Sequence, residues 1–265
     1  MGEAPLHIDT RDAIEVVALN RPDALNTMDE SLIFALQDYF RGLLERPEIR
    51  IVVLRGEGRA FCAGLDFNGW RNDGSHGVID HGWRTQRSIA TVMQLMRQCP
   101  QPIIALGHGA ACGGGFSLLL ASDVRYAAPD LRMNAAYIKV GLGGCDMGSS
   151  YFLPRLVGAS VASEYLLTGK FMDAEKALSC GLVSEIVEHD SLMDRAMALA
   201  DEMLATAPMG LRLTKDALNR NIDANGLADA MAIEDRQQVM MAVTEDHREA
   251  ISAFLEKRPP KFADQ

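Results

Sequence analysis

The sequence has few aromatic residues, no excess of basic charge and no long hydrophobic segment. Aromatic residues make up 6% of the 265 residues, and the formal net charge is -10. So acidic a chain lacks the basic face that nonspecific binding to nucleic acid or to an anionic membrane requires. No stretch approaches the roughly 20 apolar residues that span a bilayer. We therefore expect neither nucleic acid nor a membrane as a partner.

Closely spaced cysteine pairs are also absent. The five cysteines are odd in number and scattered, without any Cys-x-x-Cys pair. This spacing is typical of reduced thiols in the cytoplasm, where we expect the protein to reside. The sequence contains neither a His-Glu-x-x-His nor a Gly-x-Ser-x-Gly motif. We therefore expect no metal site, and no serine-hydrolase site either.

Hydrophobic residues make up 48% of the chain, enough to bury a core as one domain. Strand-like and helical segments alternate over the first two thirds, and helices dominate the last third. This order predicts an α/β fold. From about Asp190 onward the pattern predicts four amphipathic helices, with breaks at Pro208, at Asn225-Gly226 and near Thr244. We expect this tail to serve packing or assembly.

Hydrophobic periodicity also predicts the individual elements. The expected strands are 7–10 and 13–19, which form a hairpin, followed by 51–54, 103–106 and 124–127. The first two expected helices are 29–47 and 85–98. The loop 107–115 opens a third helix that ends near 121, and a fourth begins at 149. The segment that follows Asp66 and runs to Gly82 is rich in Gly, Asn and Asp and shows no periodicity. It predicts a long irregular loop, a feature that is usually functional or mobile.

Two glycine-containing turns follow predicted strands. They are Ala63-Gly64-Leu65-Asp66 and Gly113-Gly114-Gly115, and the second also begins a helix. Glycine allows close approach by a ligand, and a helix N-terminus offers unpaired N–H groups. Two such donors meeting on one carbonyl oxygen would stabilise an enolate. Each turn alone is more simply explained as a tight connection or a helix cap.

The pair of turns, with their surroundings, resembles the two signature segments of the crotonase (enoyl-CoA hydratase/isomerase) superfamily. The residues that carry this resemblance are Phe61-Cys62-Ala63-Gly64-Leu65-Asp66, Gly107-x-Gly-x-x-x-Gly113-Gly114-Gly115 and 121–127. Further matches, in the same order as in that family, are Leu19 to Asn26, Gly141-Leu142, Asp146-x-Gly148, Leu153-Pro154-Arg155, Leu167-Thr168-Gly169 and Gly181-Leu182-Val183. The resemblance therefore covers nearly the whole chain.

The resemblance implies a fold, an assembly and a substrate class. It implies a crotonase-like spiral of repeated ββα units over residues 1–190, and a helical C-terminal region, residues 191–265, that forms trimers or dimers of trimers and closes the CoA pocket. The substrate would be an acyl-CoA or enoyl-CoA thioester. Coenzyme A would enter as part of that substrate, with no permanently bound cofactor.

The resemblance also implies roles for individual residues. The amides of Leu65 and Gly114 would form the oxyanion hole. CoA would lie along Ala24, Leu25, Ala60, Ala63 and Leu65. The segment from Lys257 to Phe262, with Phe254, resembles one that often touches the CoA of a neighbouring subunit, so Lys261 and its basic neighbours would meet phosphate. A solvated helix end explains these basic residues equally well.

The sequence departs from the hydratase pattern at the acid/base positions. Typical hydratases carry two glutamates over the double bond, and these positions fall at Ser117 and near Tyr137. A serine is no general base unaided, and a tyrosine with a pKa of about 10 is a poor one at neutral pH. Asp146, at a position where related isomerases carry one Asp or Glu, is the best remaining carboxylate. A cap for the helix from Ser149 is the alternative reading of Asp146.

Other polar and aromatic residues have two readings. Tyr137 could donate a hydrogen bond to the acyl group, although a core position is favoured. His76, His81, Trp70 and Trp83 could tune substrate choice or supply a base, although loop histidines are usually solvated. A satisfied, half-buried histidine is the favoured reading of His108.

Two other functions compete with acyl-CoA catalysis. Gly107-x-Gly109-x-x-x-Gly113 follows a strand, precedes a helix and has Asp130 roughly 20 residues on, as in a dinucleotide site. This motif lies in mid-chain and leaves the turn at Gly64 unexplained. The second competitor is a catalytically silent acyl-CoA binder, because a CoA pocket can persist without acid or base. We favour hydratase or isomerase chemistry, with Asp146 as the acid/base.

Overall fold

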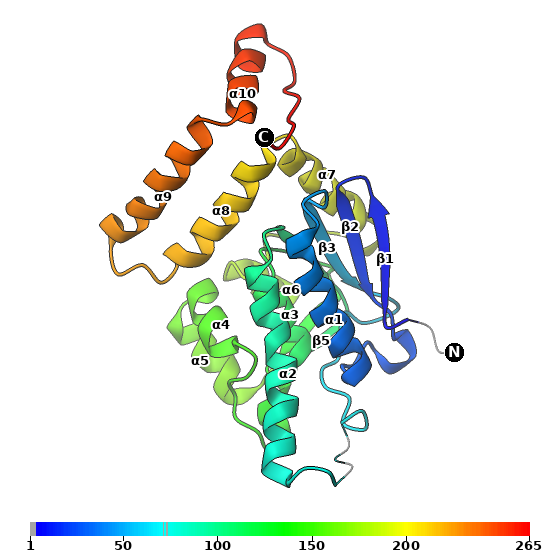
Figure 1. Cartoon of the computed structure of the whole chain (residues 1–265). Helices are drawn as coiled ribbons and strands as arrows, with labels where there is room; N and C mark the ends of the chain where they lie inside the picture. The colour runs from blue at the N-terminus through cyan, green and yellow to red at the C-terminus, as the bar shows by residue number, and fades with distance from the viewer. Residues whose placement is uncertain (1–3, 71, 73) are drawn as a thin grey trace.

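A six-stranded sheet forms the centre of the fold (Figure 1). The computed structural model describes residues 4–70, 72 and 74–265. The strand order is β1-β2-β3-β4-β6-β9, with β1 antiparallel to β2 and the other neighbours parallel. The strands are β1 (Leu6–Arg11), β2 (Ile14–Leu19), β3 (Ile51–Gly56), β4 (Ile103–Gly107), β6 (Val124–Ala127) and β9 (Glu185–Ile186). The predicted hairpin and the three predicted strands after it are confirmed within a few residues.

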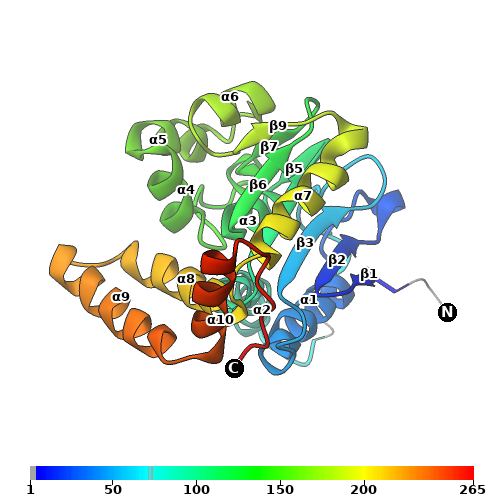
Figure 2. The ribbon, with the colours of Figure 1, turned by 90° about the horizontal axis from the view of Figure 1, so that it is seen from above.

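Both faces of this sheet are buried along β2, β3 and β4, which explains the nearly continuous apolar runs of these strands. Successive side chains of a strand point to opposite faces. Val17, Val52 and Leu54 pack on the side of α1 (Glu30–Gly42), α2 (Val78–Gln98) and α3 (Gly114–Ala121). Val16 and Val53 pack on the opposite side, against α7 (Leu192–Leu204). Figure 2 shows α7 and α1 on the two sides of the sheet.

A second, three-stranded sheet carries the chain toward the site. It consists of β5 (Ala110–Cys112), β7 (Arg132–Asn134) and β8 (Met172–Asp173), in that order. The expectation of a plain loop over 107–115 was therefore wrong, because β5 lies inside it. Strands of two or three residues are too short for an alternating pattern to show.

The predicted boundaries of α2 also need correction. The irregular loop was expected to continue to Gly82 and the helix to begin near Thr85, but α2 already begins at Val78. The glycine inside its first turns hides the helical periodicity. In that part of the helix, Arg84 pairs with Asp80 one turn earlier, with 2.9 Å between Nε and Oδ2.

The remaining helices lie in the second half of the chain. They are α4 (Ser149–Val157), α5 (Ala159–Thr168), α6 (Ala174–Ser179), α8 (Pro208–Asn221), α9 (Leu227–Ala242) and α10 (Glu245–Glu256). The four predicted C-terminal helices, α7 to α10, are confirmed with their breaks. In Figure 1 α9 and α10 project away from the sheet. None of the helices built from described residues is long and apolar enough to cross a membrane.

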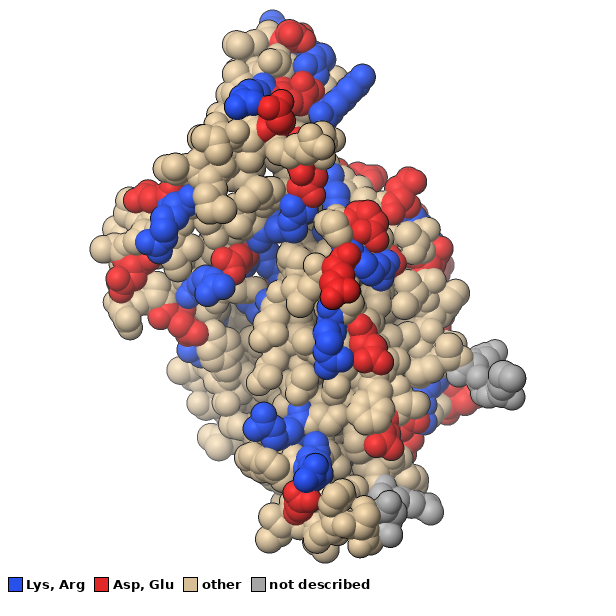
Figure 3. Space-filling view, in the orientation of Figure 1, with Lys and Arg blue, Asp and Glu red and all other residues tan. Residues whose placement is uncertain are grey.

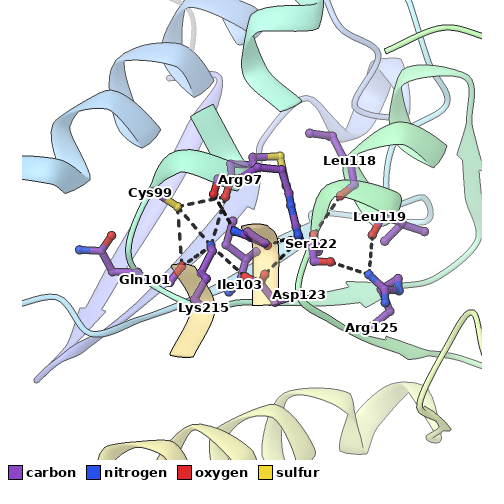
Figure 4. Close-up of polar contacts among 12 residues, drawn as sticks. Arg97, Cys99, Gln101, Ile103, Leu118, Leu119, Ser122, Asp123, Arg125 and Lys215 are labelled. Atoms are coloured by element: carbon purple, nitrogen blue, oxygen red, sulfur yellow. Dashed lines mark hydrogen bonds and ion pairs between the residues drawn. The ribbon is translucent and has the colours of Figure 1, made fainter. Parts of the chain in front are cut away.

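A buried lysine ties α8 to the central sheet (Figure 4). Lys215 is 5% exposed, and its Nζ lies 2.9 Å from Asp123 Oδ2 and donates to the Gln101 carbonyl at 2.7 Å. Asp123 also accepts from the Ile103 amide at the start of β4 and from Arg97. Lys215 therefore links α8 to the segment that leads into β4 through a buried polar network.

Charges of both signs are mixed on the surface. On the face shown in Figure 3, Lys and Arg side chains lie among Asp and Glu side chains and do not gather into a basic area.

Candidate active site

The two glycine turns lie against each other. A Cβ added to Gly113 would lie 3.9 Å from the Cα of Gly64, and one added to Gly64 would lie 3.0 Å from the Cys112 carbonyl oxygen. Both glycines have positive φ, 107° at Gly64 and 51° at Gly113. Positive φ favours glycine at both positions, and at Gly64 the close Cys112 carbonyl also leaves no room for a side chain.

Backbone hydrogen bonds hold the first turn between β5 and the residues before α1. Cys62 donates to the Ala110 carbonyl at 3.0 Å and accepts from the Cys112 amide at 2.9 Å. On the other side, Met28 donates to the Gly64 carbonyl at 2.7 Å, and Asp66 donates to the Met28 carbonyl at 3.0 Å. The hydrogen bonds to Met28 are made by the Gly64 carbonyl and the Asp66 amide, on either side of Leu65. The amide of Leu65 itself takes no part in this backbone pairing.

The second turn offers free amides for a different reason. Gly114 begins α3, and the first N–H groups of a helix have no partner within it. Within the described part of the chain, no hydrogen bond is found from the amide of Leu65 or of Gly114. Both residues line one cavity of about 130 Å³. Two free amides beside one cavity form a suitable receptor for a negatively charged oxygen.

The cavity wall is largely apolar. Its side-chain wall includes Met28, Phe67, Ile89, Ala136, Tyr137, Val140, Leu142 and Met147. Of the described residues that line it, Asp146 is the only one with an acidic side chain, and no histidine is among them. Any proton transfer by a carboxylate inside this cavity therefore falls to Asp146.

Asp146 is held by two donors. The Gln86 side chain of α2 donates to its Oδ1, and the Met147 amide donates to the same oxygen at 2.7 Å. Burial raises the pKa of Asp146 above that of a free aspartate, although both hydrogen bonds act in the opposite direction. The N-cap of α4 is Gly148, without a side-chain cap, so the reading of Asp146 as the cap of this helix was wrong.

Gln86 was missed by the sequence analysis. It lies in the helix predicted at 85–98, one turn before Ile89, which also lines the cavity. Helical spacing could have placed the two residues on one face. The sequence held no sign that this face meets a loop 60 residues away.

Ser117 and Tyr137 lie next to the cavity at the two expected glutamate positions. They are 0% and 5% exposed, so the favoured core position of Tyr137 is confirmed. Neither hydroxyl forms a hydrogen bond of ordinary geometry within the described residues. Burial raises the pKa of Tyr137 to about 12, while the nearby hydroxyls of Ser149 and Ser117 act to lower it. Tyr137 therefore stays neutral at physiological pH and is no general base.

The segments expected to contact CoA lie side by side. The Ala63 amide donates to the Leu25 carbonyl at 2.9 Å, and the Asn26 side chain donates to the Ala60 carbonyl at 2.8 Å. Leu25 and Asn26 both have positive φ, at 51° and 55°. The structure thus brings together Ala24, Leu25, Ala60, Ala63 and Leu65, with buried Asn26 as the residue that fixes the two segments.

Lys261 is not brought to this site within the chain. Its amide donates to Glu249 of α10 at 2.7 Å, and Arg258 forms two hydrogen bonds to the same carboxylate. Figure 1 shows the tail beside α10, away from the first turns of α2. Contact between Lys261 and a ligand in the cavity would require another subunit.

The other residues with two possible roles, Trp70, His76, His81, Trp83 and His108, lie outside the cavity wall. His108 is 5% exposed, with Nε2 3.0 Å from the Gly58 carbonyl oxygen, which confirms a buried and satisfied histidine. Trp70 donates from Nε1 to the Met28 carbonyl at 3.0 Å. His76 is in the segment before α2, while His81 and Trp83 belong to α2 itself.

The glycines of the dinucleotide-like motif do not form one phosphate-binding turn. β5 separates Gly107 and Gly109 from Gly113, and the Asp130 carboxylate accepts from the Gly109 amide at 3.2 Å. In a dinucleotide site the acidic residue binds ribose. Here it holds its own loop.

Comparison with known proteins agrees with this geometry. The family model for enoyl-CoA hydratase/isomerase matches residues 9–265. A probable enoyl-CoA hydratase of Mycobacterium tuberculosis is 35% identical, over 96% of this chain and 90% of the relative. The 1,2-epoxyphenylacetyl-CoA isomerase of Escherichia coli is 32% identical, over 94% of each chain.

Solved structures show the same likeness. The crystal structure of a probable enoyl-CoA hydratase/isomerase from Mycobacterium abscessus has a TM-score of 0.92 at 33% identity, over 99% of this chain and 100% of the other. The expected crotonase-like α/β fold with a helical C-terminal region is confirmed. The relatives are named as enzymes, so these findings give no support to a silent binder. The chain belongs to the enoyl-CoA hydratase/isomerase family, whose enzymes act on acyl-CoA thioesters.

Proposed function

We propose that this enzyme moves the double bond of an enoyl-CoA by proton transfer through one carboxylate. The observation that carries the proposal is that Asp146 supplies the only acidic side chain among the described residues that line the cavity. One carboxylate suffices to take a proton from one carbon and return it to another. Standard hydration uses two glutamates, and their positions here hold Ser117 and Tyr137.

The proposed reaction begins with a 3-enoyl-CoA. The amides of Leu65 and Gly114 hold the thioester oxygen, and the ionised Asp146 removes a proton from C2. The electron pair moves toward the thioester, giving a dienolate whose negative oxygen the two amides stabilise. Asp146 then returns its proton to C4, which yields the 2-enoyl-CoA. No atom is gained or lost, and no cofactor is required.

The environment of Asp146 suits both halves of this cycle. A general acid/base is most effective when its pKa lies near the working pH. Burial moves the pKa of Asp146 upward, in that direction. The carboxylate therefore binds the abstracted proton more strongly than a free aspartate does.

Hydration is the second candidate. The observation in its favour is that several relatives, such as the one from Mycobacterium tuberculosis, bear the name enoyl-CoA hydratase. Asp146 would then activate a water molecule. Addition of water to C3 of a 2-enoyl-CoA would separate this reaction from double-bond migration.

We also propose binding of CoA along Ala24, Leu25, Ala60, Ala63 and Leu65, and assembly into trimers or dimers of trimers. Support for assembly comes from large apolar side chains that α8 to α10 leave exposed: Leu218, Leu227, Val239, Val243, Phe254 and Leu255. Residues 191–265 would then form the interface, and Lys261 would meet the CoA phosphates of a neighbouring subunit. Light scattering would report a multiple of the 28.9 kDa chain mass.

The proposed function is tested by conversion of 3-hexenoyl-CoA to 2-hexenoyl-CoA, followed by chromatography and mass spectrometry. We expect the protein to catalyse conversion and Asp146→Asn to lose it, while both bind CoA esters with similar affinity. Equal rates for the two proteins would contradict the role of Asp146. Absence of conversion by the unmodified protein would contradict isomerisation.

A further inference from the structure

The acyl cavity is small. Its volume is about 130 Å³, and a cavity of about 150 Å³ holds one benzene molecule. An acyl group much larger than about six carbons therefore cannot be enclosed. Any longer group must leave through the open end of the cavity.

The open end is apolar. Phe67, Val140 and Leu142 line the cavity, yet they are 70%, 54% and 59% exposed. They therefore form the rim at which the cavity meets the surface. A hydrocarbon chain that emerges here stays in contact with apolar side chains.

One face of α2 continues this rim outward. Gln86 and Ile89 line the cavity. The residues that precede them on the same face, at spacings of three and four, are Trp83 and Ile79. These two are 63% and 88% exposed, large values for a tryptophan and an isoleucine. The four residues form a continuous stripe that begins inside the cavity and ends on the surface.

This continuity separates the stripe from scattered surface hydrophobics, which need no explanation. Val78 is also 84% exposed, and it lies about three turns before Ile89 on the same side of α2, so it widens the apolar stripe. The Cζ atom of Arg87 lies 5.9 Å from the ring centroid of Trp83. Gln86 is the polar member of the stripe, and its side chain donates to Asp146.

We propose that Ile79 and Trp83 form an outer acyl-binding track, and that the preferred substrates are CoA thioesters whose acyl groups are too long for the enclosed cavity. This inference rests on the proposed function, because it assigns the cavity to the acyl group. The first six or so carbons occupy the cavity, pass the rim at Phe67 and Leu142, and continue over Trp83. Specificity for chain length therefore depends on α2.

The test is the affinity of saturated acyl-CoAs of four, eight and twelve carbons, measured by isothermal titration calorimetry. Saturated esters undergo no double-bond migration, so binding is read independently of turnover. We expect affinity to rise about twofold for each methylene beyond those that fill the cavity. This is the gain expected when roughly half of the surface of each methylene is buried on binding. Trp83→Ala and Ile79→Asn should each weaken twelve-carbon binding about fivefold and four-carbon binding by less than about twofold.

Leu44→Asn is the matched control, since Leu44 is 60% exposed, lies beyond the end of α1 and does not line the cavity. It should leave the chain-length profile unchanged. Equal affinities for eight and twelve carbons, or equal effects of Ile79→Asn and Leu44→Asn, would overturn the track. So would a change in oligomeric mass on Trp83→Ala, because this face would then be an interface between copies. Loss of turnover with an intact length profile would count against the proposed function alone.

Discussion

The side chain of Gln86 donates a hydrogen bond to the carboxylate of Asp146, although 60 residues separate them. This contact joins α2 to the loop before α4 across the mouth of the acyl cavity. It places the candidate acid/base on one wall, while the free amides of Leu65 and Gly114 belong to the two glycine turns.

Replacing Gln86 should change the pH dependence of activity. Its hydrogen bond favours the charged carboxylate and lowers the pKa of Asp146. Gln86→Met removes this donor, so the pKa of Asp146 should rise further. A base works only when ionised, so the acidic limb of kcat/KM should move to higher pH. Gln94→Met, which alters an exposed glutamine of the same helix, should leave the profile in place; identical profiles for all three proteins would remove Gln86 from the mechanism.

Asp146→Asn should lower kcat about 10²- to 10⁴-fold, the usual contribution of a general acid/base. The amide cannot take a proton at any accessible pH, so the acidic limb should disappear from the residual activity. In the unmodified protein, burial raises the pKa of Asp146, which places that limb above the pKa of a free aspartate. Steady-state rates between pH 4 and 9 provide the measurement. A limb that persists in the variant would assign it to another group.

Gly64→Ala should damage both stability and activity. The added Cβ would lie 3.0 Å from the Cys112 carbonyl oxygen, at a φ of 107°. Such backbone strain costs about 1–3 kcal/mol, and any relaxation moves the adjacent Leu65 amide. Loss of one oxyanion donor typically lowers kcat about 10²- to 10³-fold, and we expect at least about tenfold here.

Gly158→Ala is the control for this substitution. Gly158 also has positive φ, 82°, but nothing lies within 4 Å of its added Cβ. It should lose stability through strain alone and retain its kcat. If the two variants lose kcat equally, the Gly64 turn has no special part in catalysis.

Lys215→Met should destabilise the attachment of α8 to the core. The variant leaves Asp123 without its buried partner and leaves the carbonyls of Met96 and Gln101 without a donor. Removing one partner of a buried ion pair costs about 3–5 kcal/mol. Because Asp123 keeps Arg97, we expect about 2 kcal/mol, measured by urea unfolding. Lys170→Met, which removes one partner of an exposed ion pair with Glu164, should change the free energy of unfolding little. Similar losses of stability in the two variants would mean that the Lys215 network stabilises the fold no more than an exposed ion pair does.

The sequence predicted the long elements and the two glycine turns, for identifiable reasons. The strands from Ile51 and Ile103 are buried on both faces, so they read as unbroken apolar runs. The turns were recognisable because positive φ favours glycine at Gly64 and Gly113, and backbone contact also excludes a side chain at Gly64. Ordered motifs then linked them to a known family, which the comparisons confirmed.

The parts that were missed depend on contacts between distant segments. β5 and β7 are three residues long, and their pairing is fixed by the fold, since neither has a pattern of its own. The start of α2 at Val78 is hidden by Gly82. Gln86 gave no sign of its role because its partner lies in a loop far along the chain. The helix-cap reading of Asp146 could be ruled out only once Gly148 was seen at the start of α4.

The most direct measurement is mass spectrometry of 2-enoyl-CoA and 3-enoyl-CoA thioesters incubated with the protein in ¹⁸O-labelled water. Proton transfer through Asp146 alone predicts interconversion of the two isomers without gain of oxygen. A product heavier by one labelled water would contradict that account and establish hydration, by an acid/base set other than two glutamates.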